Sequence, residues 1–329
     1  MRRITSIAAA LTLACTTVAM FAGSLVAQTG PGVYEACAPE KRKIRAGALP
    51  EVVDEDRCPV EGRVIVGGGI GAVVPEPGMA VAAEGMSPEG DRYRVVSNPR
   101  GDEFSLESVG PEPRSEASSG LETRASGPSA CQDSYYNPRD AKVCDYNRWY
   151  ANIGSIPDNV SKFRAVGAMK RGGTNIFKVK DSCGLPDRVK GVLRYKGGTW
   201  RSVDINSDGT CNVNDGKSVI GFGDLPSSYT AFACVSSWIK EGALNRVAQS
   251  DICLSKEDPA WTARVTDSCR GRYDIESTVT HREGPHVRAG EADESAHGNL
   301  TMIAESNGTC QTSERSLGRG DARGLNSKY

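Results

Sequence analysis

The cysteines of this chain constrain its fold more than any other feature. There are 11 among 329 residues, and Cys15 lies in an apolar N-terminal stretch, so ten remain outside that stretch. No Cys-x-x-Cys pair occurs. An even set of cysteines without such pairs indicates disulfides rather than thiolate metal sites. We expect Cys37 to pair with Cys58 and the eight later cysteines to pair among themselves.

The N-terminus has the pattern of a secretory signal. Arg2 and Arg3 precede an apolar stretch over residues 4–27, which ends in Ser-Leu-Val-Ala. A positive start, an apolar centre and small residues before the cleavage point are typical of signal peptides. Polar residues interrupt the stretch, and no later segment is long and apolar enough to span a bilayer. We expect a signal peptide over residues 1–28 and a secreted, extracellular protein with no membrane anchor after cleavage.

Composition narrows the expected partners. The sequence has 40 Lys and Arg against 41 Asp and Glu, and no run of basic residues is interleaved with aromatic ones. This pattern argues against a nucleic-acid partner. The length and a hydrophobic content of 38% allow about two domains with a buried core, and we expect a monomer.

Residues 29–109 form the first region. Short runs rich in β-branched residues, separated by Gly and Pro, predict strands near residues 63–66, 72–74, 79–82, 93–96 and 104–106. We interpret this region as a pro-region or a small accessory module that is β-rich or partly disordered. Residues 110–130 are rich in Pro, Ser, Gly and Glu and are interpreted as a linker.

Residues 131–329 form the second region. A helix is predicted over residues 158–169, capped by Asp158 and ended by Gly172-Gly173, with Val160, Phe163 and Val166 on one face. Strands are predicted near residues 191–195, 199–205, 219–222, 231–235 and 261–265, and a second helix from about Asp274. This order of elements indicates an α+β fold.

All three histidines lie between Tyr273 and Met302, in YDIESTVTHREGPHVRAGEADESAHGNLTM. The segment around His281 follows the zinc-helix pattern H-E-x-x-H-x-x-G-x-x-H, in which the Glu is the general base. The first His is present. Arg282 occupies the general-base position, and Pro285 and Glu291 occupy the positions of the second and third ligands.

These departures weaken the predicted zinc site. Catalytic zinc usually takes three protein ligands. Position 285 lies on the same helix face as His281, one turn further on, and His286 lies about 100° beyond it, so a straight helix cannot aim both imidazoles at one ion. Pro285 costs a helix interior roughly 3 kcal/mol. Arg282 carries a fixed positive charge where a carboxylate would activate water. His281 and His286 remain the candidate metal ligands.

The chain from about Cys131 to Tyr329 resembles the matrixin-like secreted metalloproteases of the metzincin clan. The stretches that carry the resemblance are VDIN (203–206), GTC (209–211), VIGFGDLP (219–226), AWT (260–262), YDIES (273–277), TH (280–281), residues 294–302, CQTSER (310–315) and residues 318–325. The resemblance implies a twisted, mostly parallel sheet packed on two helices, a cleft across the sheet edge, and a Met-turn that places Met302 beneath the metal. It also implies a zinc cofactor and a protein or peptide substrate. Because their loops flank family-like segments, we expect the pairs Cys183–Cys211 and Cys269–Cys310.

A compensated frameshift would explain why only residues 282–291 depart from the family pattern. Residues 282–290 can be encoded CGA GAG GGG CCA CAC GTT CGG GCT GGG. Without the first C, and with the next base completing the last codon, this reads Glu-Arg-Gly-His-Thr-Phe-Gly-Leu-Gly. Together with His281 it restores H-E-R-G-H-T-F-G-L-G. The third His needs a compensating lost base near Glu291 and one further substitution. We hypothesise such a frameshift, in the gene or in its reading.

Two other patterns have alternative interpretations. Asp204, Asn206 and Asp208, with Asp215 at the twelfth place, match the start of a calcium loop. Val203 and Ile205 alternate with polar residues, so the segment that leads into this loop is typical of a strand and not of the helix that precedes an EF-hand loop. A turn is therefore favoured over a calcium site. The sequence CGLPD beginning at Cys183 is similar to a matrixin cysteine switch, but it follows the region's first helix, so half of a disulfide is favoured.

Two functions follow from these patterns. The resemblance implies a secreted zinc endopeptidase that hydrolyses peptide bonds with zinc-activated water. The sequence as written, with no general base and two ligand positions lost, predicts instead an inactive protein of the same fold with a binding or structural role.

Overall fold

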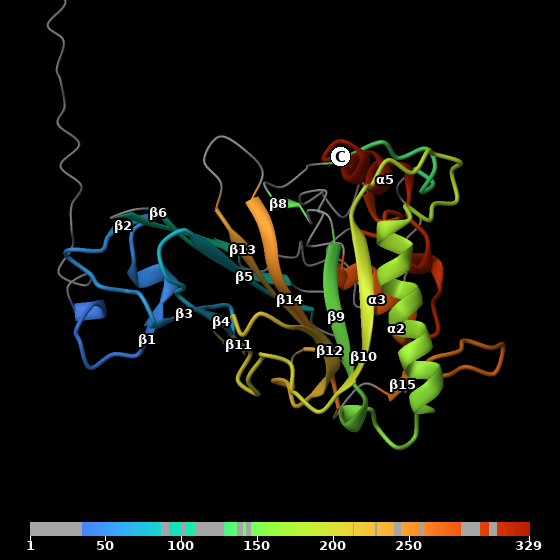
Figure 1. The fold of residues 1–329 in the computed structure, drawn as a ribbon, viewed down its shortest axis with the longest axis horizontal. Coiled ribbons are helices and arrows are strands. Elements are labelled where there is room, and N and C mark those ends of the chain that lie inside the picture. Colours follow the sequence, from blue (N-terminus) through green and yellow to red (C-terminus); the bar gives the residue numbers. More distant parts are fainter. Residues whose placement is uncertain are drawn as a thin grey trace, which may run out of the picture.

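The computed structural model describes residues 35–86, 92–100, 103–109, 128–136, 141–142, 146–212, 214–227, 229–239, 245–256, 260–283, 297–302 and 308–329. A ten-stranded mixed sheet crosses the molecule, and helices pack at one end of it (Figure 1). The α+β prediction is confirmed at this level.

The large sheet has a parallel part and an antiparallel part. In spatial order its strands are β10 (Val192–Thr199), β9 (Tyr146–Asn152), β12 (Ser218–Gly223), β14 (Asn245–Ser255), β13 (Ala231–Trp238), β5 (Met79–Met86), β6 (Arg92–Arg100), β7 (Glu103–Val109) and β2 (Val52–Asp54), with β8 (Ala141–Lys142) beside β14. Strands β10, β9, β12 and β14 are parallel. From β14 to β2 every pairing along this order is antiparallel. A mostly parallel arrangement therefore holds only for the part beside the helices.

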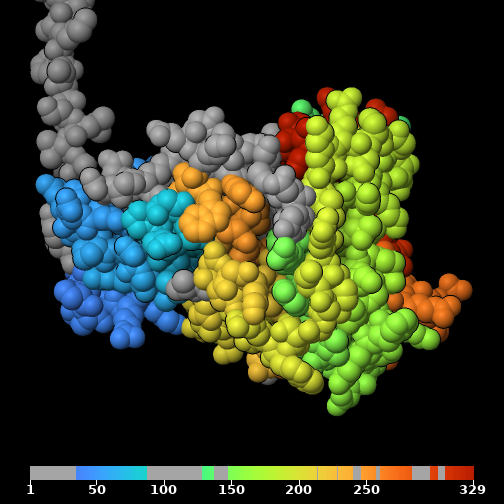
Figure 2. All heavy atoms as spheres, in the orientation of Figure 1, coloured from blue at the N-terminus to red at the C-terminus, as the bar shows by residue number. Residues whose placement is uncertain are grey.

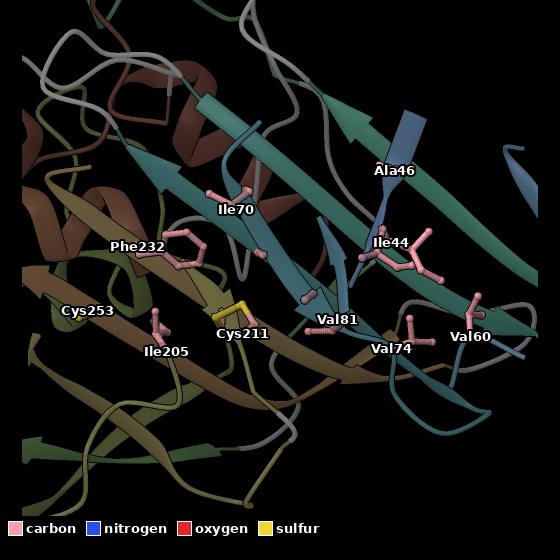
Figure 3. Close-up of a cluster of buried hydrophobic side chains, with 14 of the residues drawn as sticks. Ile44, Ala46, Val60, Ile70, Val74, Val81, Ile205, Cys211, Phe232 and Cys253 are labelled. Carbon is pink, nitrogen blue, oxygen red and sulfur yellow. A yellow bond between two sulfur atoms is a disulfide. The ribbon is translucent and has the colours of Figure 1, made fainter. Parts of the chain in front are cut away.

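The N-terminal region shares its sheet and its core with the rest of the chain. All eight residues of β5 pair with β13. A second sheet joins β1 (Lys43–Arg45), β3 (Val64–Gly67) and β4 (Ile70–Val73) to β11 (Thr210–Cys211). Figure 3 shows the cluster between them, in which Ile44, Ile70 and Val81 lie with Ile205 and Phe232. The five strands predicted within residues 63–106 are all present as β3 to β7.

The remaining strands and the 3-10 segments are short. They are β15 (Ala260–Thr262), β16 (Arg272–Asp274) and the 3-10 segments η1 (Ala46–Ala48), η2 (Ile153–Ser155) and η4 (Ser313–Arg315). The strand predicted over residues 199–205 does not form, because β10 ends at Thr199. Within the described residues, no helix is long and apolar enough to cross a membrane.

Helix α2 (Lys162–Phe177) differs in its bounds from the prediction. Ser161, not Asp158, occupies the N-cap. Phe163, expected on the buried face, is 90% exposed, whereas Ala168 and Met169 are buried. The helix also continues through the two glycines that were expected to end it. The sequence therefore predicted the presence of this helix but neither its ends nor its buried face.

The two glycines of α2 allow close packing instead of ending the helix. A Cβ added to Gly172 would lie 2.8 Å from the Cβ of Val279, which belongs to helix α3 (Ile275–Glu283). A Cβ on Gly173 would overlap Leu193 of β10. Since glycine has no Cβ, α2 can approach both α3 and the sheet, and this contact outweighs the poor helix propensity of glycine.

Two predicted disulfides are confirmed. Cys37 pairs with Cys58, and Cys269 pairs with Cys310. The Cα atoms are 5.2 Å apart in the first pair and 5.7 Å apart in the second, within the range that a disulfide spans.

The predicted pair Cys183–Cys211 is wrong. Cys183 pairs with Cys131, so it is half of a disulfide as favoured, and Cys211 pairs with Cys234. The reason is topological. Cys211 on β11 and Cys234 on β13 belong to the same buried cluster, so the fold brings these two cysteines together. Sequence spacing alone could not reveal this neighbour.

The expectation that all eight later cysteines pair is also wrong, because Cys253 is a free thiol buried on β14. Burial raises the pKa of this thiol to about 12, so it stays protonated. Cys144 lies outside the described residues.

Candidate functional site

The candidate site is built on helix α3, whose nine residues are all buried. Its first turn is capped by Asp274, whose carboxylate accepts a hydrogen bond from the Ser277 backbone N–H at 2.9 Å. The helix packs between α2 and the sheet, and the predicted helix beginning near Asp274 is confirmed. Its C-terminal end carries His281, Arg282 and Glu283.

His281 is buried, and its ring is held by the turn that precedes Met302. Its Nδ1 lies 2.7 Å from the carbonyl oxygen of Thr301. Because a carbonyl only accepts, Nδ1 carries the proton and donates it, so the lone pair of the neutral ring is at Nε2. Metal-binding histidines are usually held in this way, with one nitrogen donating to a backbone carbonyl and the other facing the metal. Met302 is buried beside this contact.

The turn at Thr301 and Met302 is fixed by Asp321 of helix α5 (Arg319–Asn326). The carboxylate accepts backbone N–H bonds from Thr301 at 2.8 Å, Met302 at 3.1 Å and Gly318 at 2.8 Å. Burial raises the pKa of Asp321 to about 6, although these hydrogen bonds favour the charged form. Sequence reasoning missed Asp321. Its only local signal is an acid three residues after the helix cap at Gly318.

His297 has a structural role beside the same turn. Its Nδ1 lies 2.8 Å from Oδ2 of the buried Asp133, and its ring stacks on Tyr135 with the centroids 4.3 Å apart. These contacts attach residues 128–136 to the segment that ends at Met302. His297 therefore anchors residues 128–136 and is not placed as a second metal ligand beside His281.

The residues after His281 are buried and charged. Arg282, at the family's general-base position, is 0% exposed, and Glu283 is 2% exposed. Burial, together with the nearby charge of Asp251 on β14, raises the pKa of Glu283 to about 8. Burial likewise raises the pKa of Asp251 to about 8, opposed by a hydrogen bond from Gln249. This end of α3 is thus a dry environment that disfavours ionised carboxyl groups.

The donor set does not fit a catalytic zinc ion as written. His281 has the tautomer of a ligand, but the general-base position is a buried cation. Pro285, His286 and Glu291 lie outside the described residues, and the first of these has no donor atom. Among the residues with described positions, no group of three or more His, Cys, Asp or Glu could hold a metal ion.

The other end of α3 holds an ion-pair network that sequence reasoning also missed. Asp274 accepts two hydrogen bonds from Arg315, both at 2.7 Å. Glu276 accepts one from Arg171 at 2.6 Å and one from Asn175 at 3.3 Å. The partners come from α2 and η4, so nothing near residues 274–276 in the sequence indicates them.

The candidate calcium residues are engaged by protein partners. Asp204 accepts a hydrogen bond from Gln249 at 2.8 Å, and Asp208 pairs with Lys43. The amides of Asn206 and Asn212 bond each other at 2.9 and 3.1 Å. A bridge between Ile205 and Cys211, together with Gly209 at φ +72°, closes a tight turn, as favoured from the sequence.

Comparison with protein-family models and with curated proteins finds no match to this chain.

Proposed function

We propose that this chain has the framework of a matrixin-like secreted zinc endopeptidase. The observation that carries the proposal is the hydrogen bond from His281 Nδ1 to Thr301 O, which holds the ring against the turn before Met302 and fixes the tautomer whose lone pair is on Nε2. Four disulfides are consistent with a protein of an oxidising, extracellular compartment. The four parallel strands beside two helices are compatible with the metzincin arrangement.

As written, the chain binds zinc weakly and does not cleave peptides. A bound zinc would polarise a water molecule and the substrate carbonyl. The residues present supply one ligand, His281, and the fixed charge of Arg282 repels a cation. Loss of a single catalytic group often costs orders of magnitude in rate, and here one base and two ligands are absent together.

A second function, as a binding or structural protein, is favoured by one observation. In family members a peptide lies along an exposed sheet edge, and addition of a strand to such an edge is a common mode of peptide binding. Here β13, which follows the parallel part of the sheet, is paired on one side with β14 and on the other with β5. Neither side of β13 is therefore open for a peptide to add as a strand. Among the described strands, β10 and β2 lie at the two edges of the large sheet, so a peptide would have to pair with one of them.

Zinc content and peptidase activity of the purified protein test these proposals. We expect substoichiometric zinc by elemental analysis and no chelator-sensitive cleavage of casein. Any zinc that is bound should be lost in His281→Ala and retained in His297→Ala, which removes an imidazole outside the site. Stoichiometric zinc with chelator-sensitive cleavage would show that the chain as written is an active protease. Zinc retained by His281→Ala would contradict the assignment of the site.

A further inference from the structure

We propose that the outer face of α2 is a docking surface for a linear anionic polysaccharide. The sequence segregates charge strongly. Residues 158–201 contain eleven Lys or Arg and three Asp or Glu, a local charge of +8, in a chain whose net charge is −1. All eleven basic residues are exposed. This proposal stands apart from the peptidase framework, since none of its residues belongs to the site around His281.

Apart from Lys162 in its first turn, the basic residues of α2 lie on one side of the helix, and Lys178 and Lys180 follow its end. We define the basic face as Arg164, Lys170, Arg171, Lys178 and Lys180. At 100° per residue the first four fall within about 120° of one another, and Lys180 follows the helix end. Over fourteen residues at 1.5 Å each, they extend about 20 Å along the axis. The helix itself contains no acidic residue. It faces outward on the side of the molecule away from the N-terminal region (Figures 1 and 2).

A groove lies on the basic face. It has a volume of ≈ 400 Å³ and is lined by Gly167, Lys170, Arg171, Thr174, Asn175 and Lys180. Gly167 contributes no side chain, so the groove stays open between turns of the helix. The groove therefore presents three cations and the exposed Thr174 to a ligand, while the buried amide of Asn175 donates to Glu276 and Thr280.

The protein pairs only part of the positive charge of the groove. Glu276 lies 2.6 Å from Arg171, 4.0 Å from Lys180 and 3.7 Å from Arg315. Arg315 is paired chiefly with Asp274, so Glu276 serves Arg171 and, at the limit of an ion pair, Lys180. Lys170 lies over the ring of Tyr195, 5.2 Å from its centroid, which orients the ammonium but does not cancel its charge. An anion bound here gains the remaining positive potential.

The shape and setting of the face select the partner. A line of cations about 20 Å long complements a chain that carries regularly spaced sulfate or carboxylate groups. An anionic bilayer is a poorer fit, because Phe163 is the only large apolar side chain that α2 exposes, and interfacial helices need a broad apolar face. The disulfides are consistent with an extracellular setting, and clusters of Lys and Arg bind heparin-like polysaccharides.

Binding of dextran sulfate to the full chain, with neutral dextran as the uncharged control, tests the proposal. We expect the protein to bind dextran sulfate in a salt-sensitive manner and not to bind dextran. The variant Lys170→Gln/Lys178→Gln/Lys180→Gln should bind about tenfold more weakly, because each exposed charge contributes a fraction of a kcal/mol. Arg171 is left intact so that the buried Glu276 keeps its partner.

The variant Arg42→Gln/Arg45→Gln/Lys256→Gln is the matched control, since it removes three exposed positive charges elsewhere. It should bind dextran sulfate within about twofold of the original chain. Equal losses in the two variants would overturn the proposal, as would equal binding of dextran. Tighter binding to phosphatidylserine vesicles or to duplex DNA than to dextran sulfate would also overturn the assigned partner. Circular dichroism of both variants excludes loss of the fold.

Discussion

Both ends of helix α3 carry buried charged groups, but the settings of these groups differ. At the N-terminal end, Asp274 and Glu276 are each matched by a specific partner, Arg315 for the first and Arg171 for the second. At the C-terminal end, Arg282 and Glu283 are buried where the pKa of Glu283 rises to about 8. Charges in a low-dielectric interior persist only with compensation, so the first end has the properties of an evolved structural network. The second end begins at Arg282, where the sequence departs from the zinc-helix pattern H-E-x-x-H.

This contrast indicates which half of the helix the sequence supports. Residues 274–281 agree with their surroundings in capping, packing and ion pairing. From residue 282 onward, a guanidinium and a carboxyl group occupy positions that face a dry interior. Natural sequences are usually consistent across such levels, and a break in consistency marks either a functional site or a lesion.

The largest expected effect comes from rewriting the second end. The variant Arg282→Glu/Pro285→His/Arg288→Gly/Glu291→His follows the reading frame that restores the zinc pattern. We expect stoichiometric zinc by elemental analysis and chelator-sensitive casein cleavage, several orders of magnitude above the original chain. Removing Pro285 from a helix interior also favours longer helix at this end.

The control for the rewriting is the same variant with His281→Ala added, which should lose the zinc. Resequencing of the locus should show either the intact pattern or the extra base. A confirmed gene whose codons cannot be shifted into the pattern, combined with a rewritten protein that binds no zinc, would defeat the frameshift hypothesis.

A smaller effect is expected at the first end, from Arg315→Met. This change leaves Asp274, whose side chain is 0% exposed, without its bidentate partner. Breaking a buried ion pair from one side costs about 3 kcal/mol or more in the free energy of unfolding. Urea unfolding at pH 7 measures it, with Arg264→Met at an exposed position as the control. A loss below about 1 kcal/mol would show that the network at this end contributes little.

The smallest effect is expected in the middle of α3, where α2 approaches it. Gly172→Ala places a Cβ 2.8 Å from that of Val279, so we expect a loss of about 1–3 kcal/mol in unfolding free energy. Gly167→Ala is the matched control, because its nearest neighbour is the flexible end of Arg171 at 3.4 Å. This control should be neutral or stabilising by up to about 1 kcal/mol. Equal effects in thermal unfolding would mean that the helix contact is not tight.

Local signals predicted much of the fold. Short runs rich in β-branched residues located β3 to β7, and the zinc-helix pattern around His281 located α3. Strands β9 and β14 were missed, because neither sequence has a run of alternating apolar and polar residues. Strand β14 also carries Gln249 and Asp251, polar residues that are buried through long-range contacts. Propensity alone assigned Gly172 the wrong role, since its use depends on Val279 of another helix.

The candidate site was predictable only in part. The resemblance placed His281 and Met302 near each other, and the structure brings His281 onto the turn that contains Met302. The support of that turn was not predictable. Asp321 lies 20 residues from Thr301 in sequence, and its role depends on the docking of α5. Ordinary sequence patterns do not encode such distant hydrogen-bond acceptors.

The pairing of β5 with β13 has a consequence for how this chain folds. During synthesis β5 emerges long before the strand that it needs, since Met79 pairs with Trp238 and Met86 with Ala231. Closing so non-local a pairing is slow, and until then the β5 edge is open to other chains. The four disulfides each join cysteines within the first region or within the second. A protease cut within residues 110–130 would therefore leave two fragments without a disulfide among these to join them, assembled as a noncovalent complex through strand pairing and a shared core.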